Sequence, residues 1–231
     1  MLAFLLCNDY LRGSLGSKNM HELILLILAY LIGSIPTAVW VSKFIFGFDI
    51  RQYGSGNAGA TNTFRVLGAK AGTFVFAVDM LKGFMAVDLA YFISKYQMDN
   101  MALTNFQILL GICAVIGHVF PIWAEFKGGK GIATLFGMIL AIQPIVAACL
   151  VAVFFAMLFL TRYVSLSSIS ASIAFPVMIF FIFKEPEMMY RIFAVATACL
   201  VVLTHHKNIN RLLAGNESKV PLFGKKKEEQ A

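Results

Sequence analysis

Long apolar runs separated by short polar segments dominate the chain. The runs extend over approximately 23–41, 73–93, 106–120, 132–160, 164–183 and 192–204. Because a helix of about 20 apolar residues crosses the hydrocarbon core of a bilayer, such runs predict transmembrane helices. The pattern therefore predicts an all-α integral membrane protein.

The fourth apolar run is long for a single crossing. It has 29 residues and contains Gln143-Pro144 within it. Because proline disrupts a helix at the preceding turn, two short helices joined at Gln143-Pro144 are as compatible with the sequence as one long helix. The split raises the predicted number of transmembrane helices from six to seven.

The distribution of Lys and Arg favours seven helices. With this count, one face of the membrane receives most of the positive charges, namely Lys43, Arg51, Arg65, Lys70, Lys127, Lys130, Arg162 and those of the C-terminal tail. The other face receives only Lys95, Lys184, Arg191 and the charges of the first residues. The positive-inside rule makes the first face cytoplasmic, with the N-terminus outside and the C-terminus inside.

Composition supports this interpretation. Hydrophobic residues make up 59% of the 231 residues and charged residues 13%, with a mean hydropathy of +0.79, which excludes an ordinary soluble domain. The net charge of +7 is explained by topology and by anionic ligands, so no nucleic-acid partner is expected. No spacing of Cys and His indicates a metal site, and no cofactor is expected.

Three regions are expected along the chain. Residues 1–20 form an extension outside the core, since their apolar stretch is too short, and lacks the leading positive region, for a secretory signal. Residues 21–217 form the membrane-embedded domain. Residues 218–231 form a basic cytoplasmic tail.

The first polar segment with candidate chemistry is GSGNAGATN, at 54–62. Its glycines let the backbone approach a ligand, and its short side chains offer hydrogen-bond donors. Nearby arginines add charge suited to a phosphate, although a solvated loop is the alternative. The candidate substrate-binding residues of this segment are Ser55, Asn57, Thr61, Asn62 and Arg65, with Arg51 as a further source of charge.

The second segment is GHVFPIWAEFKGGKGIAT, at 117–134. It does not match the GxxxxGK[ST] phosphate loop, but consecutive free N–H groups at the start of a helix, together with Lys130, predict an anion site. The candidate residues are Gly128, Gly129, Lys130 and Gly131. His118 also belongs to this segment, and a structural histidine and a functional one both remain compatible with the sequence.

Two further segments complete the candidate site on the cytoplasmic face. RYVSLSSIS, at 162–170, offers serine hydroxyls either to a ligand or to the backbone of a helix start. HHKNINRLLAGNE, at 205–217, places His205, Asn208 and Arg211 near one helical face. A basic helix end that extends its side chains towards water is the competing explanation for the latter.

Taken together, these motifs resemble the bacterial acyl-phosphate:glycerol-3-phosphate acyltransferase family, PlsY. The resemblance covers about residues 23–217 and rests on GSIP (33–36), GSGNAGATN with Arg65, DMLKG (79–83), GHVFPIWAEFKGGKGIAT, YVSLSS and HHKNINR, in the family's order. It implies a seven-helix enzyme of the bacterial plasma membrane with cytoplasmic active-site loops. It also implies catalytic roles for Ser165, Ser168, His205 and Asn208, and places Arg211 and Glu217 in the substrate site.

The implied reaction moves a fatty acyl group from acyl phosphate to the 1-hydroxyl of glycerol 3-phosphate, which yields lysophosphatidic acid and phosphate. The implied partners are these substrates, membrane lipid and the soluble enzyme that makes acyl phosphate. Direct transfer without an acyl-enzyme is expected, with either His205 or the donor's own phosphate accepting the proton. None of the four histidines has the His-x-x-x-x-Asp spacing common in acyltransferases that use acyl-CoA.

A transporter of phosphate or organic anions is the alternative function. Transporters usually bind substrate near the bilayer midplane, between repeated halves of the chain. No internal repeat is evident here, and the candidate groups gather at one membrane face. These features favour the enzyme.

Overall fold

The computed structural model describes residues 20–93, 96 and 98–220, and all regular elements in these residues are helices. The expected N-terminal extension, apart from Met20, and most of the basic tail lie outside the described residues. The chain divides into two compact units, the first ending at Ile142 and the second beginning at Gln143. Each unit is described by itself.

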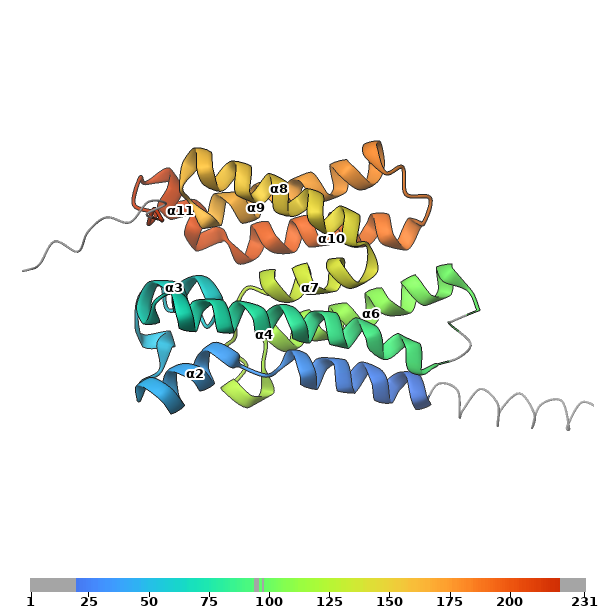
Figure 1. Cartoon of the computed structure of the whole chain (residues 1–231), viewed down its shortest axis with the longest axis horizontal. Helices are drawn as coiled ribbons and strands as arrows, with labels where there is room; N and C mark the ends of the chain where they lie inside the picture. Colours follow the sequence, from blue (N-terminus) through green and yellow to red (C-terminus); the bar gives the residue numbers. More distant parts are fainter. Residues whose placement is uncertain (1–19, 94–95, 97, 221–231) are drawn as a thin grey trace, which may run out of the picture. The chain divides into compact units, whose positions relative to one another are not determined.

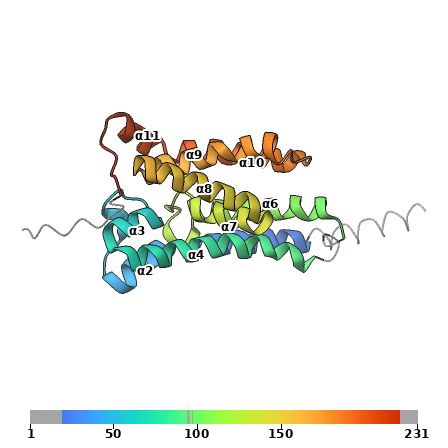
Figure 2. The same ribbon diagram turned by 45° about the horizontal axis from the view of Figure 1, so that its top comes forward.

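The first unit contains six helices among its described residues (Figure 1). They are a first helix at Met20–Gly33, then α2 (Thr37–Phe46), α3 (Ala60–Leu67), α4 (Ala69–Asp88), α6 (Asn100–Val119) and α7 (Ile132–Ile142). Short 3₁₀ turns at Ile50–Gln52 (η1), Leu89–Phe92 (η2) and Ile122–Ala124 (η3) connect them. The short α3 lies against the N-terminal part of α4 (Figure 2).

A break separates the first helix from α2. The two helices bend by 41° at residues 34–36, where Pro36 cannot donate a backbone hydrogen bond. The first helix approaches α6 closely just before this break, because a Cβ on Gly33 would lie 2.0 Å from the carbonyl oxygen of Ala114. Glycine is therefore required at this contact.

Helices α4 and α7 also meet through glycines. A Cβ on Gly83 would lie 2.1 Å from the carbonyl oxygen of Thr134, and one on Gly137 would lie 1.9 Å from that of Met80. Each helix thus presents a glycine to the backbone of the other. This contact fixes the start of α7, where the second glycine-rich segment ends, against the middle of α4.

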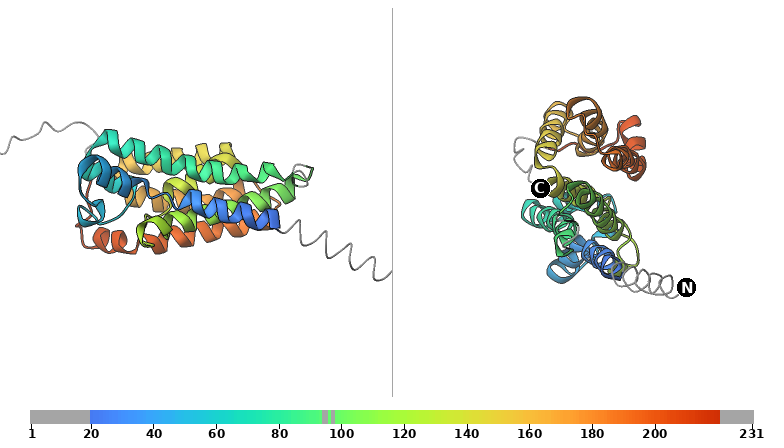
Figure 3. Two further views of the ribbon diagram at one scale, coloured as in Figure 1. Left: turned by 90° about the horizontal axis from the view of Figure 1, so that it is seen from below. Right: turned by 90° about the vertical axis from the view of Figure 1, so that its right-hand side faces the viewer.

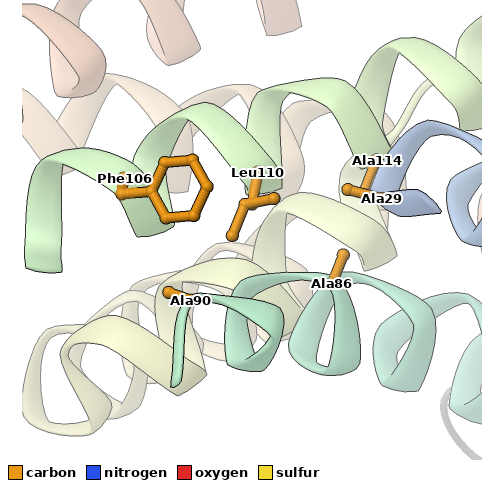
Figure 4. Close-up of a cluster of buried hydrophobic side chains, with 6 residues drawn as sticks. All are labelled: Ala29, Ala86, Ala90, Phe106, Leu110 and Ala114. Atoms are coloured by element: carbon orange, nitrogen blue, oxygen red, sulfur yellow. The ribbon is translucent and has the colours of Figure 1, made fainter. Parts of the chain in front are cut away.

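The apolar core of this unit lies between the first helix, α4 and α6. Its buried members are Ala29, Ala86, Ala90, Phe106, Leu110 and Ala114. Figure 4 shows Leu110 extending from α6 towards the side where Ala86 and Ala90 lie. Small alanines on two neighbours leave room for the larger side chains of α6, which is how closely packed interiors avoid voids.

The second unit is a helical hairpin extended by two more helices. It contains α8 (Pro144–Thr161), α9 (Val164–Val177) with a π-helical continuation η4 (Met178–Ile182), α10 (Met188–Thr204) and α11 (His206–Leu213). Helix α9 packs against both α8 and α10, and the views in Figures 1 and 3 show the three running side by side. Helix α11 bends away from α10 by 60°.

The predicted break at Gln143-Pro144 is confirmed. Helix α7 ends at Ile142 and α8 begins at Pro144, so proline takes the first helical position, where its missing N–H costs nothing. Length and composition identify fewer crossings than the seven predicted. Among the described residues, three helices are long and apolar enough to cross a membrane, or up to five if each bent pair is one span.

Candidate active site

The first glycine-rich loop is organised by Asn62. Its side chain is 1% exposed, and its Oδ1 accepts a hydrogen bond from the N–H of Ser55 at 2.9 Å. Its Nδ2 donates to the carbonyl oxygens of Tyr53 at 3.0 Å and Ile50 at 3.3 Å. The amide group of Asn62 therefore holds the loop in shape. Contact of Asn62 with substrate remains a prediction, because these hydrogen bonds occupy its side-chain amide within the protein.

The other candidates of this loop face outward to different degrees. Ser55 and Asn57 are half-buried, whereas Thr61 and Arg65 are exposed on α3. The two exposed residues are four positions apart, so they share a helical face, while Asn62 points into the protein. The loop thus offers Ser55, Asn57, Thr61 and Arg65 to a ligand.

The backbone of the second glycine-rich loop is largely occupied. The N–H of Gly128 donates to the carbonyl of Val119 at 3.1 Å, and that of Gly129 donates to the carbonyl of His118 at 3.2 Å. The expectation that these two N–H groups are free for an anion is therefore wrong. Glycine is needed because the loop folds back on the end of α6: a Cβ on Gly128 would lie 1.9 Å from the carbonyl oxygen of His118.

The predicted anion site is therefore limited to Lys130, Gly131 and the first turn of α7. Gly131 has a φ of +79°, a conformation that favours glycine, and α7 begins at the next residue. The first N–H groups of a helix have no acceptor within the helix and carry the positive end of its dipole. Together with the half-buried Lys130, this first turn keeps the character of an anion site.

The two glycine-rich loops lie next to each other. A Cβ on Gly129 would lie 3.2 Å from the carbonyl oxygen of Ala58, and Ala58 packs with Val39 and Ala124. Arg51 adds a polar link, since its guanidinium donates to the carbonyl of Ala124 at 2.9 Å. The structure therefore brings two of the four candidate segments together within the first unit.

Arg51 serves this link rather than a phosphate. Its guanidinium also pairs with both carboxylate oxygens of Asp49, the shortest contact being 2.7 Å. The hydrogen bonds from Arg51, with a smaller one from Lys43, hold the pKa of Asp49 well below its ordinary value despite partial burial. The same carboxylate raises the pKa of Arg51. The charge of Arg51 is thus already balanced.

The second unit gathers its candidates around one carboxylate. Glu217 Oε1 accepts from Ser165 Oγ at 2.9 Å and from Asn208 Nδ2 at 2.7 Å, and Oε2 accepts from Arg211 Nε at 2.7 Å. The Glu217 side chain is only 5% exposed. Burial alone would raise the pKa of Glu217, but the three hydrogen bonds hold it below the ordinary value, so the carboxylate stays ionised.

A turn after α11 brings Glu217 to this position. Gly215 has a φ of +72°, and the N–H of Asn216 donates back to the carbonyl of Arg211 at 2.8 Å. Further along, the N–H of Val220 donates to the carbonyl of Arg162 at 2.9 Å. The segment 214–220 therefore crosses the connection between α8 and α9, next to the start of α9, where the serines lie.

The two adjacent histidines differ in burial. His205 is 3% exposed, and its Nδ1 lies 2.8 Å from the carbonyl oxygen of Val201, whereas His206 is exposed. Because a carbonyl only accepts, the neutral His205 ring carries its proton on Nδ1 and its lone pair on Nε2. Nε2 of this tautomer can accept a proton. The role of His205 as a base remains a prediction.

The serines are also distinguished. Ser165 is the one that donates to Glu217, whereas Ser168 donates to the carbonyl of Val164 at 3.0 Å within its own helix. Ser167 is bonded in the same way, to Tyr163 at 2.8 Å. A catalytic role for Ser168 remains a prediction, with its hydroxyl engaged by the backbone.

His118 is placed away from water. It is 6% exposed, and its Nδ1 lies 3.7 Å from Oδ1 of Asp79, which forms an ion pair with Lys82. No role was predicted for Asp79 and Lys82 from the sequence. Their position inside an apolar run nevertheless indicates a function, because charged residues in such runs are rare. Contact of His118 with substrate remains a prediction.

The comparisons with known proteins agree with this set of motifs. A sequence model described as glycerol-3-phosphate acyltransferase matches residues 23–215. The chain belongs to this family. The match lies inside the predicted domain at 21–217, whose exact bounds remain a prediction.

Members of the glycerol-3-phosphate acyltransferase family are similar over nearly their whole length. The enzyme of Fusobacterium nucleatum is 41% identical over 84% of this chain and 95% of its own, and that of Bacillus velezensis is 44% identical over 87% and 98%. A crystal structure of PlsY, an integral membrane glycerol 3-phosphate acyltransferase in its glycerol 3-phosphate form, has a TM-score of 0.76 and 38% identity, and covers 87% of this chain and 96% of that one. These similarities confirm an all-α integral membrane protein.

The Glu217 cluster predicts a stability effect that depends on pH. Glu217→Gln should lower the free energy of unfolding at pH 7 by about 2 kcal/mol, because Arg211 loses a largely buried partner. Since the folded pKa lies below the ordinary value of 4.5, this stabilisation is present above pH 4.5 and is lost as the pH falls through the folded value. Thermal unfolding in detergent between pH 7 and pH 3 measures the difference.

The matched control is Glu125→Gln. Glu125 pairs with Lys127 at 3.8 Å, and both side chains are 74% exposed, so little change is expected at any pH. An equal and pH-independent loss in both variants would show that Glu217 does not organise the second unit through its charge.

Proposed function

We propose that the protein transfers a fatty acyl group from acyl phosphate to the 1-hydroxyl of glycerol 3-phosphate, forming lysophosphatidic acid for phospholipid synthesis. Family membership carries the proposal. Related structures at 38% identity, described as glycerol 3-phosphate and lysophosphatidic acid forms of PlsY, support the identity of acceptor and product. Acyl phosphate as donor rests on the motifs and on the lack of a His-x-x-x-x-Asp pair.

Two phosphate-bearing substrates require at least two anion sites. The proposed cations are Arg65 on α3, Lys130 before α7 and Arg211 on α11. Arg211 also pairs with Glu217, but its side chain is 36% exposed, against 17% for Arg51. The acyl chain of the donor would lie along the large apolar side chains that the helices expose, such as those of Phe155 and Phe159 on α8. A soluble enzyme that makes acyl phosphate is the expected supplier of the donor.

The proposed chemistry is a direct acyl transfer. The 1-hydroxyl oxygen attacks the acyl carbon, the bond from that carbon to the phosphate oxygen breaks, and phosphate leaves. The hydroxyl proton passes either to Nε2 of His205 or to the donor's own phosphate. Glu217 holds the side chains of Ser165, Asn208 and Arg211 in a fixed arrangement that would orient the substrates. A covalent acyl-enzyme is not needed, because acyl phosphate carries a good leaving group.

We further propose seven crossings in the bacterial plasma membrane, with the glycine-rich loops and the C-terminus in the cytoplasm. The count adds α4 and the short α7 to the spans that satisfy length and hydropathy. Asp79 and Lys82 lower the hydropathy of α4, but they are buried and paired, which a crossing helix tolerates.

The topology is tested with single cysteines in a variant that lacks the four native ones. Lys127→Cys and Lys219→Cys, both at exposed positions, should react with a membrane-impermeant thiol reagent from the same cytoplasmic side, and Met98→Cys from the other. Six crossings would place positions 127 and 219 on opposite sides, so labelling of these two positions from opposite faces would contradict the count.

The donor is tested with the purified protein in detergent. Given glycerol 3-phosphate, it should form lysophosphatidic acid from palmitoyl phosphate without added metal and little or none from palmitoyl-CoA, because acyl phosphate carries its own good leaving group. Product formation by mass spectrometry distinguishes an enzyme from a transporter, since no membrane is present. Comparable rates from the two donors, or loss of activity with EDTA, would refute the mechanism.

The role of Lys130 is tested by Lys130→Met. If its charge stabilises phosphate in the transition state, turnover should fall roughly a hundredfold or more, with insertion and thermal stability retained. Lys127→Met is the matched control, since Lys127 lies three residues away and is 74% exposed. Near-normal turnover in a well-folded Lys130→Met variant would leave Lys130 without a catalytic role.

A further inference from the structure

The ion pair inside α4 is the largest feature that the proposed reaction leaves unused. Asp79 and Lys82 lie one turn apart, with Nζ of Lys82 2.7 Å from Oδ1 of Asp79. Their side chains are 2% and 4% exposed. Burying two charges is costly even when they pair, and paired charges in membrane helices commonly mark functional regions.

The pair is tied to the break between the first helix and α2. Thr37 Oγ1 donates to Asp79 Oδ1 at 3.0 Å, and Lys82 Nζ donates to the carbonyl oxygen of Ile35 at 3.0 Å. The broken helix therefore supplies a donor to the carboxylate and an acceptor to the ammonium group. Both ends of the ion pair are fixed in place by backbone or by a short side chain.

A third group faces the carboxylate. Nδ1 of the buried His118 lies 3.7 Å from Asp79 Oδ1, and it has no hydrogen-bond partner among the described residues. A buried polar atom that has no hydrogen-bond partner destabilises a protein. Because a carboxylate only accepts, the arrangement favours an N–H on Nδ1 directed at Asp79.

The opposite edge of the same ring touches the second glycine-rich loop. A Cβ on Gly129 would lie 2.2 Å from Nε2 of His118, so only glycine fits against the imidazole there. The carbonyl of His118 also accepts from the N–H of Gly129 at 3.2 Å. The imidazole therefore spans the space between the ion pair and the residue next to Lys130.

We propose that Asp79 is a positioning residue that acts through His118. Held by Lys82 and Thr37, its carboxylate orients the imidazole with the proton on Nδ1, and the Nε2 edge of the ring then sets the position of Gly129 and of the loop that carries Lys130. This role rests on the proposed function, since the loop is the proposed phosphate site of the acyltransferase.

The alternative is an ion pair that only stabilises the helices. Removing one charge does not separate the two, because the other charge would stay buried and unpaired, which strongly destabilises a protein. Replacing both charges at once avoids this problem. The test variant is therefore Asp79→Val/Lys82→Gln, which removes the acceptor that faces His118 and keeps an amide donor for the carbonyl of Ile35. The control is Asp88→Val, at a half-buried carboxylate on the same helix.

The double variant should unfold within a few degrees of the wild type, yet its kcat/KM with palmitoyl phosphate and glycerol 3-phosphate should fall about tenfold or more. In a His118→Asn background, the same double replacement should cost little further, because residues that act in one chain of contacts are not additive. A folded double variant with normal kcat/KM, or full additivity with His118→Asn, would overturn the proposal.

A spectroscopic test needs no activity. In ¹⁵N spectra of histidine-labelled protein in detergent, His118, assigned with His118→Asn, should show a protonated Nδ1 and an unprotonated Nε2, and this pattern should weaken in the double variant. A wild-type His118 protonated on Nε2 would overturn the Asp79 contact. If the wild type made no lysophosphatidic acid but showed the expected tautomer, the proposed function would fail while the contact stood.

Discussion

Backbone groups that are buried away from water need a hydrogen-bond partner, and this constraint governs the break after the first helix. The chain stops being helical at 34–36, and the carbonyl of Ile35 is satisfied by Lys82 from another helix. Lys82 in turn requires Asp79, and Asp79 accepts from Thr37 beyond the break. One interrupted helix thus accounts for two buried charges, and these charges lie beside the histidine that supports a candidate substrate loop.

Both glycine-rich loops are built mainly by contacts within the protein. Asn62 satisfies three backbone groups of the first loop, and the end of α6 accepts from two N–H groups of the second. A loop that is held by hydrogen bonds within the protein is preorganised. The loop therefore loses little conformational entropy when a ligand binds to it. Few groups are then left to bind a ligand. Most of them lie after the loops, such as Thr61 and Arg65 on α3 and the first N–H groups of α7.

Much of the architecture could be predicted from the sequence, because apolar length, proline and charge act locally. Gln143-Pro144 predicted a helix boundary, and α7 ends and α8 begins there. His205 was predicted for the site, and it is the buried one of the two adjacent histidines. By contrast, the roles of Asn62, Gly128 and Arg51 depend on which backbone group folds back onto each residue. Spacing along the chain contains no information on such contacts, so these residues were assigned to a ligand when their partners are within the protein.

The position of Glu217 has a consequence for biosynthesis. The carboxylate that joins α9 to α11 comes from the segment that follows α11, and the N–H of Val220 in the same segment donates to the carbonyl of Arg162. During translation, Ser165 is made 52 residues before its acceptor, whereas Asn208 precedes the acceptor by only 9 residues. The polar cluster therefore assembles only after residue 217 has been made, and a chain that stops before this residue lacks the carboxylate that joins α9 to α11.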